Sequence, residues 1–137
     1  MIICNRMVQT IDTEFIYACK NDDIEKVQNL LEGINENHLN INYKNMYGNS
    51  GLLWSCHNGS KQMCRLLLNY NADVNICDDF GNSPLIIATK EGHYDLCIFL
   101  IEAQSNIHHK NYMNYCAINY AAMNNNIILV DLLMNAY

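Results

Sequence analysis

One five-residue pattern recurs three times in this chain, each time after an interval of 33 residues. It is GNSGL at Gly48–Leu52, GNSPL at Gly81–Leu85 and NYCAI at Asn114–Ile118. The same interval relates other positions: Ser55, Ala88 and Ala121; Gly59, Gly92 and Asn125; Cys64, Cys97 and Val130; Leu67, Leu100 and Leu133. A fixed period of this length, with two short helical patterns and a turn in each unit, is typical of a solenoid of stacked repeats.

The third unit shows most clearly how such a repeat folds. A turn ends at Gly81, and Ser83-Pro84 supplies an N-cap followed by proline at the first helical position. The helix should end at Gly92, because glycine readily adopts the left-handed conformation that stops a helix. A second helix then carries Leu96, Cys97, Leu100 and Ile101 on one face. One such hairpin cannot cover its own apolar face, so neighbouring units must stack on it.

The repeated unit resembles the ankyrin repeat. The resemblance rests on GNSPLIIA at 81–88, EGH at 91–93 and FLI at 99–101, and in the second unit on LLL at 66–68 followed by NADVN at 71–75. It implies an all-α ankyrin-repeat solenoid of stacked helix-turn-helix units with short β-hairpin-like turns. We expect a single domain over residues 1–137, with repeats at about 10–43, 44–77, 78–110 and 111–137.

The composition limits the classes of partner and the compartment. A chain of 137 residues that is 50% hydrophobic has enough apolar side chains for the core of one domain. The net charge of -6, with scattered Lys and Arg, argues against a nucleic-acid ligand. No apolar run is long enough to cross a membrane, and residues 1–6 do not begin a typical signal peptide, so we expect neither membrane insertion nor secretion.

The seven cysteines are better explained by the repeat than by disulfide bonds. Cys64 and Cys97 share a position with Val27 and Val130, while Cys19 and Cys56 share one with Thr89 and Ala122. Cysteine therefore occupies repeat positions that small or β-branched residues fill in other units. Such exchange is typical of a buried, reduced cysteine. This pattern predicts a reducing compartment, the cytoplasm or the nucleus. Ankyrin proteins are also common in viruses and bacteria that live inside eukaryotic cells, and for those the compartment would be the host cytoplasm.

The two ends of the array differ. The first unit has Lys26 and Asn29 where later units have apolar residues, which predicts a polar cap with no preceding neighbour. The last unit has Ile127 and Ile128 where the second has Lys61 and Gln62. We expect the last unit to pack on another copy or on a partner, or else to derive from a longer array.

The sequence does not contain a convincing catalytic or metal-binding set. Cys56 and His57 are adjacent, but neighbouring side chains on a helix point about 100° apart, so a nucleophile and base would not converge there. The pair His108 and His109 has no further ligand at a suitable spacing for zinc. His93 follows the helix-ending glycine, where the resemblance implies a packing and hydrogen-bonding role. We therefore predict no enzyme activity, cofactor or metal.

The resemblance places the binding surface on the concave face, formed by the turn tips and the first helices. The matching positions are Met46, Tyr47, Asn49, His57, Asn58, Asp79, Phe80, Asn82, Thr89, Lys90, Tyr112, Met113, Tyr115, Met123 and Asn124. Aromatic residues and methionine are frequent among them, as in many protein interfaces. Tyr47 and Phe80 could instead pack the turns against one another. Trp54 shares a position with Ile87 and Tyr120, which predicts a place in the core.

These observations favour a non-enzymatic adaptor that binds another protein through the concave face. The alternative is a structural module that forms homo-oligomers through the apolar C-terminal repeat. Neither the repeat nor the composition identifies the partner, because the same fold serves many unrelated roles.

Overall fold

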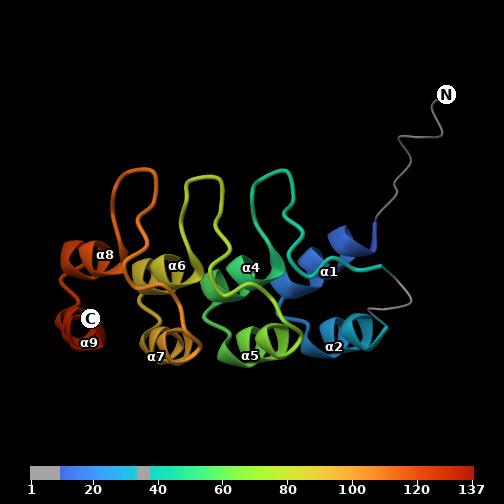
Figure 1. The fold of residues 1–137 in the computed structure, drawn as a ribbon. Coiled ribbons are helices and arrows are strands. Elements are labelled where there is room, and N and C mark those ends of the chain that lie inside the picture. Colours follow the sequence, from blue (N-terminus) through green and yellow to red (C-terminus); the bar gives the residue numbers. More distant parts are fainter. Residues whose placement is uncertain (1–9, 34–37) are drawn as a thin grey trace.

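The computed structural model describes residues 10–33 and 38–137, and this part of the chain contains eight α-helices and no strand. The helices form four antiparallel pairs stacked side by side in two layers (Figure 1). The first layer consists of α1 (Ile11–Lys20), α4 (Gly51–Asn58), α6 (Pro84–Glu91) and α8 (Ala117–Met123). The second consists of α2 (Ile24–Glu32), α5 (Lys61–Asn69), α7 (Tyr94–Glu102) and α9 (Ile127–Ala136). The predicted all-α solenoid is confirmed.

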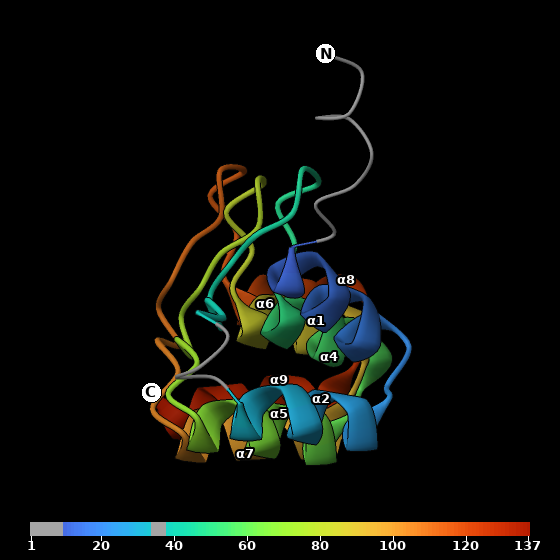
Figure 2. The same ribbon diagram turned by 90° about the vertical axis from the view of Figure 1, so that its right-hand side faces the viewer.

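Long loops before α4, α6 and α8 rise from the first layer on one side (Figures 1 and 2). Each loop turns back at a tight tip before it enters its helix. One side chain at the base of the tip holds the turn: Asn45, Asp78 or Asn111. The Oδ1 atom of Asp78 accepts the backbone N–H groups of Phe80 and Asn82, both at 2.8 Å. Asn45 and Asn111 make the same pair of bonds in their own tips. The turns are thus hairpin-like without forming strands among the described residues, and their backbone is fixed by local hydrogen bonds.

Capping residues set the ends of the middle helices. The hydroxyl groups of Ser50, Ser60 and Ser83 each accept the backbone N–H three residues later, which satisfies a free donor at the helix start. Gly59 and Gly92 end α4 and α6 with φ of 71° and 81°. The predicted start of a helix at Ser83-Pro84 and its end at Gly92 are confirmed.

The core lies between the two layers and between successive pairs. Its apolar side chains include Phe15, Leu31, Leu52, Leu53, Met63, Leu67, Leu85, Ile86, Leu96, Leu100, Leu129 and Leu133. Cys19, Cys56, Cys64 and Cys97 are buried among them as free thiols, as the repeat register predicts. Cys4 lies outside the described residues.

Both ends of the stack carry polar side chains where inner units are apolar. Lys26 is exposed and forms an ion pair with Glu14 at 2.9 Å, whereas Met63 in the same position of the next unit is buried. Asn29 is likewise exposed, so the predicted N-terminal cap agrees with the structure. At the other end, Asn119 is exposed in the position that Leu53 occupies in the core. Polar groups therefore lie on α2 at the N-terminal end of the stack and on α8 at the C-terminal end.

Neighbouring tips approach one another closely at the turn glycines. Gly48 and Gly81 have φ of 74° and 77°, a conformation that other residues adopt with strain. A Cβ atom on Gly81 would lie 2.9 Å from Cδ1 of Tyr112 in the next tip, and one on Gly48 would overlap the carboxylate of Asp79. The backbone N–H of Tyr112 also donates to the carbonyl of Phe80 at 3.1 Å. The tips are therefore packed in contact and act as one surface.

Substituting Gly81 should measure this contact. Gly92→Ala introduces a left-handed alanine with no atom near its Cβ and should cost about 1–2 kcal/mol of unfolding free energy. Gly81→Ala should cost roughly 1 kcal/mol more, because its Cβ also meets the Tyr112 ring. Chemical denaturation followed by circular dichroism compares the two variants. Adding Tyr112→Ala should reduce the excess, because it removes the ring but not the backbone nitrogen at 3.1 Å, and an equal cost for both glycines would contradict the packed tips.

Candidate protein-binding surface

The tips and the exposed sides of the first helices border one side of the molecule (Figure 2), which we call the inner face. Large apolar side chains stand on all three tips. Met46, Tyr47, Phe80, Tyr112 and Met113 are between 68 and 84% exposed. Such a row of exposed aromatic and methionine side chains is unusual for a surface that contacts only water.

Most of the remaining predicted positions are also accessible. The exposed ones are Asn58, Asp79, Lys90, Met123 and Asn124, and the half-buried ones are Asn49, His57 and Tyr115. Tyr115 packs edge-on against Tyr120, with ring centroids 5.8 Å apart. The inner face is therefore continuous from the tips to the C-terminal ends of the first helices.

The prediction was wrong for Asn82 and Thr89. Asn82 is only 8% exposed, because its amide donates to Asp78 at 2.9 Å and accepts from the amide of Asn111 at 2.8 Å. Thr89 is fully buried, and its hydroxyl donates to the carbonyl of Leu85 at 2.8 Å. Thr89 shares the core position of Cys56, so the expected exposed pair on α6 was placed one residue too early. The accessible residues there are Lys90 and Glu91.

Glu91, which the sequence analysis did not select, links two first helices. Its Oε1 lies 3.2 Å from Nδ1 of His57. Asn58 and Asn124 occupy the same register position in their own units. The side-chain amide of Asn58 donates to the backbone carbonyl of Lys20 at 2.9 Å, and the side-chain amide of Asn124 donates to the backbone carbonyl of Lys90 at 3.0 Å. These three residues therefore bond each first helix to the one before it, and only part of their polar surface is free for a partner.

Trp54 is less buried than predicted. Its ring packs against the core on one side, but it is half-buried and borders a hollow of about 210 Å³ on the inner face. The ammonium group of Lys20 lies 4.8 Å from its ring centroid. Tyr17, exposed in the same hollow, was missed. It occupies the register position of Trp54, as the match of Cys19 with Cys56 implies, and it was missed because that position was assigned to the core.

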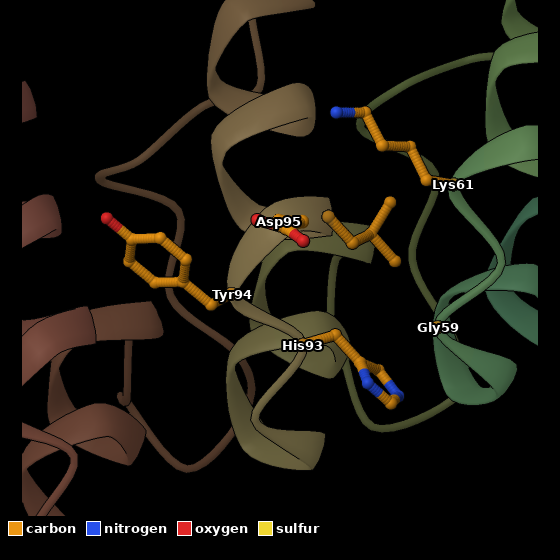
Figure 3. A pocket seen from close by; sticks show the side chains of 6 residues that line it. Gly59, Lys61, His93, Tyr94 and Asp95 are labelled. Carbon is orange, nitrogen blue, oxygen red and sulfur yellow. The ribbon is translucent and has the colours of Figure 1, made fainter.

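A second hollow, of about 350 Å³, lies where α5 and α7 begin (Figure 3) and is lined by Gly59, Lys61, His93, Tyr94, Asp95 and Leu96. The His93 ring points toward Gly59, while Tyr94 extends to the other side of the start of α7 (Figure 3). Nε2 of His93 donates to the carbonyl of His57 at 3.1 Å. The hydrogen-bonding role predicted for His93 is confirmed, and this bond leaves Nε2 no role as a free base.

The other residues considered for chemistry do not converge. Cys56 is buried beside Cys64, with the sulfur atoms 3.8 Å apart, while Nδ1 of His57 faces Glu91. His109 Nε2 lies 2.8 Å from the carbonyl of Gly81 and 3.3 Å from Sγ of Cys77. Over residues 10–33 and 38–137, no three His, Cys, Asp or Glu side chains cluster as metal ligands would. None of the helices described is both long enough and apolar enough to span a membrane.

Burial makes the core thiols unreactive, which can be measured. It raises the pKa of Cys97 from 9.0 to about 11, and it also raises the pKa values of Cys19 and Cys56. Because the thiolate is the reactive form, iodoacetamide at pH 8 should modify Cys97 in folded protein about 100-fold more slowly than in guanidinium. Peptide mass spectrometry gives the rate for each site.

The same shifts predict how stability depends on pH. Above about pH 9 the unfolded chain ionises its thiols while the folded chain keeps them protonated, so the unfolding free energy should fall as pH rises from 9 to 11. An unfolding free energy that stays constant from pH 9 to 11, or equal iodoacetamide labelling rates for Cys97 in folded and unfolded protein, would contradict the burial of these thiols.

The two-layer stack of helical pairs places the chain in the class of proteins built from stacked helical repeats. Comparison with known families agrees: a model described as ankyrin repeats matches residues 15–111 with three copies. This chain therefore belongs to the ankyrin repeat family. Ankyrin repeats generally mediate protein–protein interaction and are typically non-enzymatic.

Several curated proteins are similar to the chain. It is 29% identical over 87 residues to the Notch-regulated ankyrin repeat-containing protein of Homo sapiens, covering 64% of this chain and 76% of that protein. A putative ankyrin repeat protein of Rickettsia bellii is 25% identical over 101 residues, which cover 72% of this chain and 60% of the relative. The DNA replication inhibitor plutonium of Drosophila melanogaster is 35% identical over 66 residues, covering 48% and 38% of the two chains. The names of two of these three relatives include the ankyrin repeat.

Proposed function

We propose that this chain is a non-enzymatic adaptor, a single domain of four repeats at about 10–43, 44–77, 78–110 and 111–137, that binds a partner protein through its inner face. The observation that carries the proposal is the row of five large apolar side chains on the tips, each more than two-thirds exposed. Hydrogen bonds at the base of each tip fix the backbone that presents them. The buried free thiols favour a reducing compartment, the cytoplasm or the nucleus, as its place of action.

The competing explanation is that the tip side chains serve only to pack the turns together. Tyr112 does cover Gly81, and the Asp79 carboxylate covers Gly48. Even so, Tyr112 keeps 81% of its surface exposed and Phe80 keeps 71%. Because packing between tips uses little of these side chains, most of their apolar area is free for a partner.

Charged substitutions on the tips test the proposal. The triple variant Tyr47→Asp, Phe80→Asp and Tyr112→Asp should lose capture of its partners from a lysate of the native host, since it buries charge where apolar contact is needed. Affinity capture with quantitative mass spectrometry measures the loss, and circular dichroism should stay unchanged.

A matched control adds the same charge to the second-helix layer. Asn29→Asp, Gln62→Glu and Tyr94→Asp change exposed residues of α2, α5 and α7 and should leave capture intact. If the tip variant and this control capture the same proteins as the native chain, the inner face is not the binding surface.

Self-association is the second candidate function, because the last helix is unusually apolar outside. Ile127 and Ile128 are 79% and 65% exposed, and Met134 of the same helix is also exposed. At the positions of Ile127 and Ile128, the inner pairs have exposed Gln62, Tyr94 and Asp95 and half-buried Lys61, so these two side chains lie on the outer surface of the second layer and not on the end face of the stack. The patch therefore fits contact with another copy better than the continuation of an array.

Restoring the polar residues of the second unit tests this candidate. If the patch joins two copies, the native chain should dimerise at high micromolar concentration, and Ile127→Lys with Ile128→Gln should be monomeric because the apolar contact is lost. Static light scattering over a concentration series decides the matter. A native chain that stays monomeric at high micromolar concentration would rule out homo-oligomers of this kind.

A further inference from the structure

The hollow beside Trp54 has the features of a side-chain pocket. It lies across the junction of the first two helical pairs, and its volume of about 210 Å³ is smaller than the roughly 300–1,000 Å³ of sites for drug-sized molecules. It therefore suits one side chain of a partner and little more. The lining residues come from α1, from α4 and from the tip between them: Thr13, Ile16, Tyr17, Lys20, Asn45, Tyr47 and Trp54.

Three of its seven lining residues are aromatic. Tyr17 and Tyr47 are well exposed at the hollow, and the half-buried indole of Trp54 packs against the core behind it. The indole N–H is buried and has no acceptor among the described residues. Aromatic walls of this kind hold a large apolar side chain.

The charge of the hollow is positive, although the chain as a whole carries -6. Lys20 is its cation, held over the Trp54 ring at 4.8 Å, and the lining includes no carboxylate. The two acidic residues of α1 are engaged elsewhere: Glu14 pairs with Lys26, and Asp12 accepts the backbone N–H of Asn40. Within residues 10–33 and 38–137, Lys20 itself forms no ion pair. A negative group entering the hollow would find an unpaired ammonium beside an apolar wall.

We propose that this hollow binds a peptide segment in which a large apolar side chain stands next to a carboxylate. The apolar side chain lies between Tyr17, Tyr47 and Trp54, and the carboxylate pairs with Lys20. The inference rests on the proposed function and deepens it, because it gives the chemistry of the partner segment at one end of the inner face.

The single tryptophan of the chain makes the test direct, since all indole fluorescence comes from the hollow itself. The probes are two blocked tetrapeptides, acetyl-Gly-Phe-Glu-Gly-amide and acetyl-Gly-Phe-Gln-Gly-amide, titrated to about 5 mM at low salt. The Glu peptide should give a saturable change in fluorescence, and the Gln peptide should bind about fivefold more weakly because it lacks the charge.

Three variants assign the effect to named side chains. Lys20→Gln should abolish the preference for the Glu peptide. Arg65→Gln, which removes a cation lying 5.8 Å from the Phe99 ring on the second layer, should preserve it. Tyr17→Ala should weaken both peptides alike, because it removes an apolar wall and no charge. Circular dichroism confirms that each variant is folded.

Equal affinity for the two peptides, no saturable change, or a preference that survives Lys20→Gln would each overturn the inference. Tyr47 lines the hollow and also belongs to the tip variant, so the double variant Phe80→Asp and Tyr112→Asp, which leaves the lining of the hollow unchanged, is the tip variant that separates the two proposals. A negative titration together with capture that depends on the tips rejects the pocket alone. A saturable titration, together with capture that the tip substitutions leave unchanged, rejects the tip surface alone.

Discussion

Burial of apolar surface between successive helical pairs is the interaction on which the whole structure depends. Each helix has ten residues or fewer, too short to be stable alone in water, and each pair leaves an apolar side that only the next pair can cover. Met63, Leu96 and Leu129 repeat at one position and are buried, whereas Lys26 at that position in the first unit is exposed. The contrast shows that this position faces the preceding unit, so stacking, and not the single repeat, produces the core.

Polar contacts between units then fix how the pairs are aligned. The side-chain amide of Asn58 reaches the end of α1, that of Asn124 reaches the end of α6, and His93 donates to the carbonyl of His57. Apolar burial does not depend on direction and tolerates small shifts, whereas a hydrogen bond requires a particular distance and angle. These bonds therefore align the C-terminal ends of neighbouring first helices, while the bonds from Asn111 to Asn82 and from Tyr112 to Phe80 join two of the tips.

The features that followed from the sequence were those decided within one unit or by the repeat period. Ser83-Pro84 and Gly92 bounded α6, and the alternation of cysteine with valine placed the thiols in the core. The features that were missed depend on contacts between units. Asn82 is buried because Asn111 of the next unit bonds to it, and Trp54 is half-exposed because Lys20 and Tyr17 of the previous unit leave a hollow beside it. A local pattern does not contain such contacts, and the position that Tyr17 shares with Trp54 had been assigned to the core.

The position of that hollow has a consequence for how the chain unfolds. In a stack with nearest-neighbour coupling the outer units fray first, because each is held from one side only. The hollow takes side chains from α1 on one side and from α4 and its tip on the other, so a bound segment would touch both units at the junction where fraying begins. Binding there would add to the coupling energy of that junction. Occupancy and the local order of the N-terminal pair would then rise and fall together.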